Sequence, residues 1–251
     1  MKLLTLARDL GRRKAREKQS LFVAEGVRSV EELVRSGLTI RGTLVAPQLA
    51  TAPRGQALRK SLDDSGIEVA EVSEKDFRSA AETESPQGVI AIGEIPARSL
   101  DTLEIAAGCR LLLLDGVQDP GNVGTILRTA AALGATATIA LPGTVDLWNP
   151  KVIRSSMGAQ FRHPAFHAAQ DDVLMFLDRS KIVLWAADAS GSTLDRAGAP
   201  PRLAIAVGNE GSGLSEAIRA KAQRTVSLPI SAGVESLNVA VAAGIILYEL
   251  R

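Results

Sequence analysis

The feature that most constrains the fold is an uninterrupted apolar run at residues 110–114, where four consecutive leucines follow an arginine. A short apolar run without polar alternation is typical of a strand buried on both faces of a parallel sheet. The segments after this run predict helices at 122–133, 152–157, after 214 and at 236–250, with strands at 136–141, 182–186, 203–207 and 225–228. Strands that alternate with helices predict an α/β domain whose mostly parallel sheet is covered on both faces.

The first part of the chain shows the same alternation on a smaller scale. We expect a polar, basic helix at 2–19, then helices at 26–34, 57–64 and 74–81 and strands at 22–24, 42–46, 67–72 and 88–93. Residues 95–99, Ile-Pro-Ala-Arg-Ser, are typical of a linker, although the proline could equally mark an ordinary turn. The sequence therefore predicts a smaller α/β domain at 1–95 and a larger one at 96–251.

Positive charge is concentrated at the start of the chain. Residues 1–18 contain seven basic and two acidic residues, a net charge of +5, whereas the whole chain carries only +1. A local excess of this kind suits a polyanionic partner such as a nucleic acid, but it is also typical of a solvated helix face. The aromatic content of 3% argues against base stacking as the main contact, and favours contacts to an RNA backbone.

Cysteine and histidine are too scarce for several classes of site. Cys109 is the single cysteine, and His163 and His167 are the two histidines. An intramolecular disulfide is therefore impossible, a zinc site of cysteine and histidine lacks ligands, and a Ser-His-Asp hydrolase would depend on one of two imidazoles. The apolar stretch at the start is interrupted at Arg8, so we expect no signal peptide, no membrane span and a cytoplasmic protein.

Polar residues follow three of the predicted strands, and ligands gather at the carboxyl ends of strands in an open parallel sheet. After residue 114 comes Asp-Gly-Val-Gln-Asp-Pro-Gly-Asn-Val-Gly-Thr-Ile-Leu-Arg, which contains Asn122 and Arg128. These two residues lie six apart and do not share one helix face well, but they could converge if Asn122 caps the helix. The alternative is that Asn122 is only an N-cap and Arg128 a surface residue.

The second segment, at 208–215, is rich in glycine. Its sequence Gly-Asn-Glu-Gly-Ser-Gly-Leu-Ser brings backbone amides close to a ligand, although an ordinary strand-to-helix loop explains the glycines about as well. Glu210 in this loop would repel a phosphate, which favours a ligand with hydroxyls, an amine or a positive charge. The third segment, at 228–242, holds Ser236 and Asn238 at the start of the last expected helix, where both could serve as caps.

Taken together, these segments strongly resemble the three motifs of the SpoU family, also called the TrmH family, of RNA ribose 2′-O-methyltransferases. The matching stretches are N-x-G-x-x-x-R at 122–128, G-N-E-G-S-G-L-S at 208–215 and L-P-I…E-S-L-N-V-A-V-A at 228–242, in that order. Residues 154–159, Arg-Ser-Ser-Met-Gly-Ala, also resemble the family. The resemblance covers about residues 108–251, and Phe-Val-Ala-Glu-Gly at 22–26 resembles the family's substrate-binding domain.

The resemblance implies a fold that periodicity alone would not predict. It implies a parallel-sheet domain with a deep trefoil knot, the SPOUT fold, beside a smaller ribosomal-protein-like α/β domain, and a homodimer formed near the knot. It implies S-adenosylmethionine as the cofactor, held by Gly208, Glu210, Gly211, Leu228, Ile230 and Leu237, with no metal. The residues that match the family's functional polar positions are Asn122, Arg128, Glu210, Ser236 and Asn238.

From these matches we expect Arg128 to anchor the phosphate and ribose of the target nucleotide and to polarise its hydroxyl. A guanidinium stays protonated, so the general base is left unassigned. Asn122 would orient the hydroxyl or the neighbouring backbone, Glu210 would fix local hydrogen bonds, and Ser236 and Asn238 would shape the ribose and methionine ends. The expected RNA-contacting residues are Arg12, Arg13, Lys14, Arg16, Lys18 and Arg128.

Ribosomal RNA is the favoured substrate by analogy, because of the N-terminal substrate domain. Three alternatives remain: a transfer RNA 2′-O-methyltransferase, a non-catalytic RNA-binding protein on the same scaffold, and an ordinary dinucleotide-binding oxidoreductase. The last is disfavoured because the glycine loop reads G-x-x-G-x-G and no G-x-G-x-x-G follows an early strand.

Overall fold

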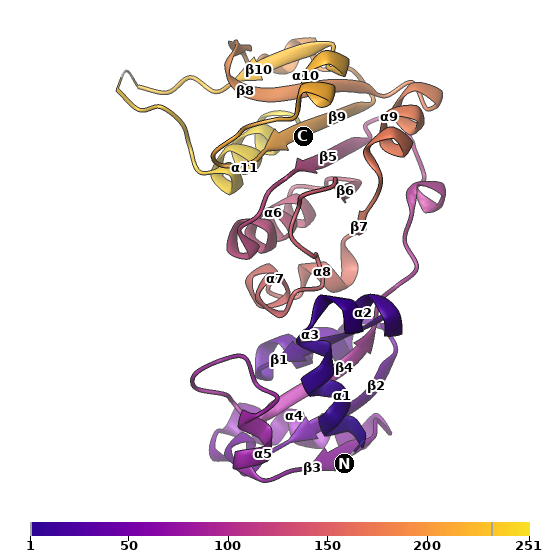
Figure 1. Cartoon of the computed structure of the whole chain (residues 1–251), viewed down its shortest axis with the longest axis vertical. Helices are drawn as coiled ribbons and strands as arrows, with labels where there is room; N and C mark the ends of the chain where they lie inside the picture. The colour runs from indigo at the N-terminus through magenta and orange to yellow at the C-terminus, as the bar shows by residue number, and fades with distance from the viewer. Residues whose placement is uncertain (1, 232) are drawn as a thin grey trace. The chain divides into compact units, whose positions relative to one another are not determined.

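The chain forms two compact units in the computed structural model, which describes residues 2–231 and 233–251 (Figure 1). One unit contains Met1–Ala97 together with Trp148–Arg162, and the other contains Arg98–Leu147 together with His163–Arg251. We call them unit 1 and unit 2. The assignment of residues 1–95 to substrate binding and of 96–251 to catalysis stays a prediction.

Unit 1 is built on a four-stranded sheet in the order β1-β4-β2-β3. Strands β1, β4 and β2 pair antiparallel, and β2 pairs parallel with β3. The strands are β1 (Leu21–Glu25), β2 (Ile40–Val45), β3 (Val69–Glu71) and β4 (Val89–Glu94). The helices of the first segment are α1 (Lys2–Leu10), α2 (Arg13–Gln19), α3 (Val27–Ser36), η1 (Pro47–Thr51), α4 (Pro53–Asp64) and α5 (Glu74–Arg78).

The single basic helix expected at 2–19 is wrong, because the chain breaks at Gly11 into α1 and α2. The guanidinium of Arg16 donates hydrogen bonds to the carbonyls of Leu10 (2.7 Å) and Gly11 (2.8 Å). Carbonyls at the end of a helix have no partner within that helix, so Arg16 satisfies groups that the break leaves open. As a result Arg16 is only 2% exposed.

The second segment of unit 1 comes from the middle of the chain and contains α7 (Pro150–Ser156) and α8 (Ala159–Arg162). Phe22 on β1 packs on both ends of this segment, with ring centroids 4.6 Å from Trp148 and 5.6 Å from Phe161. Arg162 also forms an ion pair with Glu32 at 2.8 Å. Because all three aromatic side chains are buried, unit 1 has an apolar core to which both segments contribute.

Unit 2 is built on a six-stranded parallel sheet in the order β10-β8-β9-β5-β6-β7. Its strands are β5 (Arg110–Asp115), β6 (Ala137–Ala140), β7 (Ala165–His167), β8 (Val183–Thr193), β9 (Leu203–Gly208) and β10 (Arg224–Ser227). Its helices are η2 (Leu100–Thr102), α6 (Pro120–Ala132), α9 (Gln170–Arg179), η3 (Arg196–Gly198), α10 (Glu216–Lys221) and α11 (Val239–Glu249).

The expected parallel α/β architecture is confirmed. Strand β5 lies between β9 and β6, and its four leucines are fully buried, as the apolar run predicts. The sequence did not predict β7 and α9, and α11 begins at Val239 rather than near Ser236. The trefoil knot stays a prediction. Within the described residues, no helix is long and apolar enough to cross a membrane.

Candidate functional site

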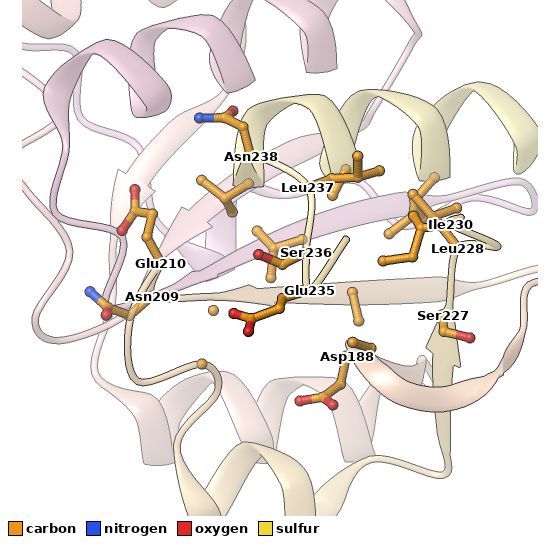
Figure 2. A pocket seen from close by; sticks show the side chains of 18 of the residues that line it. Asp188, Asn209, Glu210, Ser227, Leu228, Ile230, Glu235, Ser236, Leu237 and Asn238 are labelled. Atoms are coloured by element: carbon orange, nitrogen blue, oxygen red, sulfur yellow. The ribbon is translucent and has the colours of Figure 1, made fainter. Parts of the chain in front are cut away.

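A pocket of about 580 Å³ opens in unit 2 at the carboxyl ends of β9 and β10 and beside the middle of β8 (Figure 2). Its volume is in the range that binds small ligands and cofactors. The wall consists of residues from these three strands, parts of the segment that leads from β10 to α11, and one side of α11. The residues that line it are Ala187, Asp188, Ala189, Val207, Gly208, Asn209, Glu210, Gly211, Gly213, Val226, Ser227, Leu228, Ile230, Glu235, Ser236, Leu237, Asn238, Val239, Ala242 and Ile246.

The structure brings together all six residues expected to hold a cofactor. They line this one pocket from two segments that are separate in sequence: Gly208, Glu210 and Gly211 from the loop after β9, and Leu228, Ile230 and Leu237 from the segment after β10. The glycine loop supplies backbone groups and a carboxylate, and the second segment supplies apolar side chains. A ligand with polar and apolar parts could therefore be held here, and the roles of individual residues stay predictions.

The loop at residues 208–213, which we call the glycine loop, folds back on itself directly after β9. Asn209 and Gly213 exchange two backbone hydrogen bonds of 3.0 Å, and Gly213 has a φ of +70°. This closure leaves no room at Gly208, where a Cβ atom would lie 2.4 Å from the carbonyl carbon of Gly213. Glycine at 208 is therefore required by a close backbone approach rather than by its own φ.

Asn209 and Asp115 hold this loop in place, and neither was predicted as a site residue from the sequence. The Oδ1 atom of Asn209 accepts hydrogen bonds from the amides of Gly211 and Ser212 at 2.9 Å, and its Nδ2 donates to the carbonyl of Gly116 at 2.9 Å. Asp115, which is only 7% exposed, accepts a 2.6 Å hydrogen bond from the amide of Ser215. Both residues stand directly at the carboxyl end of an expected strand, which was the signal that could have identified them.

Asn122 does not cap its helix. Asp119 is the N-cap of α6, and its side chain accepts a 2.7 Å hydrogen bond from the amide of Asn122. The amide group of Asn122 is thereby left available for tertiary contacts: its Nδ2 donates to Glu210 at 2.8 Å, and its Oδ1 accepts from Nδ2 of Asn238 at 2.9 Å. The interpretation of Asn122 as only an N-cap is therefore wrong.

Asn238 is both a cap and a part of this network. Its Oδ1 accepts hydrogen bonds from the amides of Ala240 (2.9 Å) and Val241 (3.3 Å) at the start of α11, which confirms the capping interpretation. The chain Asn238–Asn122–Glu210 therefore joins residues from all three sequence segments. Ser236 lines the pocket but lies outside α11, so its interpretation as a helix cap is wrong.

Arg128 lies on α6 and is exposed. It does not line the pocket, and within residues 2–231 and 233–251 it makes no hydrogen bond or ion pair. Of the five expected catalytic residues, Glu210, Ser236 and Asn238 line the pocket, and Asn122 is bonded to two of them. Arg128 is the one that the structure does not connect to this group.

The pocket lining is acidic. It contains Asp188, Glu210 and Glu235, and the described part of the lining includes no lysine, arginine or histidine. Hydrogen bonds from Ser190, and then the nearby Arg219 guanidinium at 2.7 Å, hold the pKa of Asp188 below its usual value. Sequence reasoning missed Asp188, although it stands just past the strand expected at 182–186. Within the described residues, no group of three or more potential ligands could hold a metal ion.

The basic residues of the N-terminal segment differ in how accessible they are to an RNA ligand. Arg12 pairs with Asp9 at 2.5 Å and Arg13 pairs with Glu17 at 2.7 Å, and exposed pairs of this kind exchange easily with other partners. Lys14 and Lys18 are exposed on α2. Arg16 is buried by its bonds to two carbonyls, so we withdraw it from the expected RNA-contacting set.

Comparison with known families gives two matches that together span most of the chain. Residues 110–248 match the SpoU rRNA Methylase family, and residues 5–91 match the MRM3-like substrate binding domain. The first match includes all three polar segments, and the second lies within unit 1.

Two similar proteins match over nearly the whole chain. The chain is 34% identical over 97% of its length to the Bacillus subtilis 23S rRNA (guanosine(2553)-2′-O)-methyltransferase RlmP, of which it covers 94%. It is also 33% identical over 96% of its length to a 23S rRNA (uridine(2479)-2′-O)-methyltransferase of Streptomyces viridochromogenes, covering 85% of that protein.

Among solved structures, the SpoU methyltransferase AviRb from Streptomyces viridochromogenes in complex with the cofactor AdoMet superposes with a TM-score of 0.86 at 30% identity. The superposition covers 99% of this chain and 96% of that one. An AdoMet-bound rRNA methyltransferase from Sinorhizobium meliloti gives a TM-score of 0.85 at 28% identity, covering 99% and 94% of the two chains.

Proposed function

The chain belongs to the SpoU rRNA methylase family, and we propose that its pocket binds S-adenosylmethionine for transfer of a methyl group to a ribose 2′-hydroxyl of ribosomal RNA. The observation that carries the proposal is the hydrogen-bonded chain Asn238–Asn122–Glu210 at the pocket edge. Asn238 and Asn122 are 116 residues apart in sequence, and Asn122 and Glu210 are 88 residues apart. A protein that only binds RNA would not need this arrangement of polar side chains. This observation favours an enzyme over a non-catalytic RNA-binding protein.

The residues of the pocket fit S-adenosylmethionine. Backbone groups of the glycine loop at Gly208 would hydrogen-bond the polar parts of the cofactor, and Leu228 and Ile230 would supply apolar contacts. The acidic lining suits a ligand with a positive charge and disfavours a phosphate-bearing dinucleotide. The cofactor supplies an electrophilic methyl group on a positively charged sulfur.

The chain's own side chains would align the hydroxyl and anchor the RNA. Asn122 is held from both sides, by Glu210 and by Asn238, so its amide has a fixed orientation at the pocket edge. A fixed amide can orient a ribose hydroxyl without reorganisation during the reaction. Arg128 would hold the phosphate next to the target ribose as a permanently charged group, and it is not the base. Ser236 lies in the pocket wall.

Ribosomal RNA is favoured over transfer RNA because two relatives that match over nearly the whole chain, at 34% and 33% identity, are named 23S rRNA methyltransferases. The direct experiment is to map 2′-O-methyl sites in total RNA from cells with and without the gene. The loss of one or a few sites in ribosomal RNA, restored by the purified protein and S-adenosylmethionine, is the expected result. A lost site in transfer RNA would redirect the substrate assignment. A cytoplasmic location stays a prediction.

RNA recognition belongs, in this proposal, to the exposed basic residues of α2. We expect the double variant Lys14→Glu, Lys18→Glu to bind substrate RNA about tenfold more weakly, and the slope of log affinity against log salt to fall by about one for each lost phosphate contact. Filter binding at several salt concentrations measures both quantities. The double variant Lys60→Glu, Lys75→Glu is the control, because it makes the same change of charge at exposed positions on α4 and α5 of the same unit. Equal effects of the two changes would contradict a specific role for α2.

Deletion of residues 1–95 is a poor test of the same idea. Trp148 and Phe161 pack on Phe22 within unit 1, so the deletion would expose a buried aromatic cluster along with removing the basic helix. Exposed clusters of this kind promote aggregation. Charge substitutions on α2 leave that core intact and separate RNA binding from folding.

We also propose a homodimer that forms over the exposed face of α11. Val241, Ile245 and Tyr248 are 51%, 40% and 50% exposed and recur at helical spacing on one side of α11. The buried residues Ala240, Ala243 and Leu247 lie on the other side of the helix, and α11 packs on α6 along the edge where Gly244 faces Thr129. An apolar stripe on a helix that already covers its own sheet is typical of a subunit interface. In such a dimer Arg128, exposed on α6 beside Thr129, could serve the pocket of the second subunit.

The dimer has a direct test. The wild-type protein should sediment as a dimer at micromolar concentration, and the variant Val241→Glu, Tyr248→Glu should sediment as a monomer, because two charges would be buried in an apolar contact. Met175→Glu is the control, since Met175 is a similarly exposed apolar residue on α9. A wild-type protein that remains monomeric would remove the dimer from the proposal.

A further inference from the structure

Two carboxylates in the pocket, those of Glu210 and Glu235, form no ion pair with any residue that the structure describes. Of the three acidic side chains in the lining, Asp188 is paired with Arg219 at 2.7 Å and accepts a hydrogen bond from the Ser190 hydroxyl at 2.7 Å. Glu210 is bonded only to the neutral amide of Asn122, and Glu235 makes no ion pair within the part of the chain that the structure describes. The net charge that the pocket presents to a ligand is therefore negative.

Glu235 lies in the segment that closes the pocket after β10. It immediately precedes Ser236 and Leu237, which also line the pocket, and Figure 2 shows its side chain among the labelled pocket residues, between Glu210 and Asp188 in this view. Unlike Glu210, it takes no part in the Asn238–Asn122–Glu210 chain. It can therefore interact with a bound ligand without disturbing the positioning of the hydroxyl.

The reaction changes the charge of the cofactor. The carbon–sulfur bond of the sulfonium breaks, its electron pair stays on sulfur, a carbon–oxygen bond forms to the ribose, and the hydroxyl proton leaves to solvent. The sulfur is positive in the donor and neutral in the product, S-adenosylhomocysteine, and the two molecules otherwise differ only by the methyl group. A negative pocket consequently attracts the donor more strongly than the product.

We propose that Glu235 is a specificity-determining residue that makes the pocket prefer the charged donor to the neutral product, with Glu210 as a second contributor. The inference rests on the proposed use of S-adenosylmethionine in this pocket. Its functional consequence is that methyl transfer itself removes part of the binding energy of the cofactor. S-adenosylhomocysteine is then released more readily, and accumulated S-adenosylhomocysteine competes less well with S-adenosylmethionine for the pocket.

Isothermal titration calorimetry of both ligands against the wild-type protein and Glu235→Gln tests the inference. Glutamine has nearly the same shape without the charge. We expect the ratio of the two affinities, donor over product, to fall by about fivefold, a size in keeping with a solvent-accessible charge interaction. The affinity for the product should change by less than about twofold. In the wild-type protein the same ratio should fall as sodium chloride is raised, because salt screens exposed charges.

Glu104→Gln is the matched control. Glu104 is an exposed carboxylate of unit 2 that precedes β5, whereas the pocket lies at the carboxyl ends of the strands, so its removal should leave the ratio unchanged. An unchanged ratio in Glu235→Gln, or an equal loss for both ligands, would overturn the inference. Should the variant not fold, the salt titration of the wild-type protein tests the charge preference independently. If the wild-type protein binds neither ligand, the cofactor assignment itself fails; if it binds both without preference, only the inference fails.

Discussion

The Arg128→Ala variant is expected to lose nearly all RNA methylation while keeping its affinity for S-adenosylmethionine. Arg128 lies outside the pocket lining and makes no ion pair within the described chain, so its removal leaves the cofactor walls intact. Alanine is also a strong helix former, so α6 should stay folded. The expected loss in kcat is on the order of 100-fold or more, as for the removal of one positioned donor in an active site.

Methylation of a substrate RNA fragment and calorimetry with the cofactor measure the two effects separately. Arg179→Ala on α9 is the control, because Arg179 is an exposed arginine of the same unit. Parallel loss of activity and cofactor affinity in Arg128→Ala would contradict the assigned role. So would full activity of the variant.

Gly208→Ala should abolish cofactor binding rather than the chemical step alone. The added methyl group would lie 2.4 to 2.5 Å from backbone atoms of Gly213 and Leu214, and backbone cannot give way as a flexible side chain can. The loop that carries Glu210 must therefore open, and we expect cofactor affinity to fall by roughly 100-fold or more. Calorimetry measures the loss, and thermal unfolding shows whether the rest of the protein remains folded.

The comparison variant is Gly211→Ala in the same loop. A Cβ atom there would approach only the Asn209 Oδ1 atom, at 3.5 Å, which is ordinary contact. We expect at most a modest loss of cofactor affinity from this change. Similar losses from the two substitutions would mean that the backbone closure at Gly208 does not shape the binding site.

Mixing the Arg128→Ala and Gly208→Ala variants tests whether Arg128 acts across the proposed dimer. Neither Arg128→Ala nor Gly208→Ala homodimers should methylate RNA. A mixed dimer would have one intact pocket facing an intact Arg128 from the other subunit, so activity should reappear on mixing if the arginine acts in trans. If it acts within its own chain, no subunit of the mixed dimer is complete, and the mixture should stay inactive.

Much of unit 2 could be predicted from local patterns. The four leucines of β5 and the alternation of strands and helices after them were sufficient for a parallel sheet, because a strand buried on both faces has only apolar positions. The rule that ligands gather at strand ends located the segments at Asn122, Glu210 and Asn238. The roles of individual residues could not be predicted from these local patterns. Asn122 matched a helix cap by sequence, and only the coordinates place Asp119 in that position.

Other features were inaccessible because they depend on contacts between distant residues. The positions of Asp188, Asn209 and Asp115 just after expected strands could have marked them as candidates, but their partners Arg219, Gly116 and Ser215 lie far away in the sequence and are shown only by the coordinates. The burial of Arg16 could not be predicted from the sequence either, since a basic residue in a basic helix is normally exposed. The break at Gly11 created the open carbonyls that Arg16 satisfies.

The sequence by itself determined the class of fold, the three polar segments and, through their resemblance to a known family, the kind of chemistry. These properties are encoded in short stretches, because hydrophobic period and turn residues act over a few positions. The tertiary structure decided which side chains meet. It joined Asn122 to Glu210 and Asn238, left Arg128 outside the pocket, and drew Trp148 and Phe161 into the core of unit 1. It also left Glu235 without an ion pair among the described residues, in an acidic pocket wall. Distances between residues a hundred positions apart depend on how whole strands and helices pack, and no local pattern contains that information.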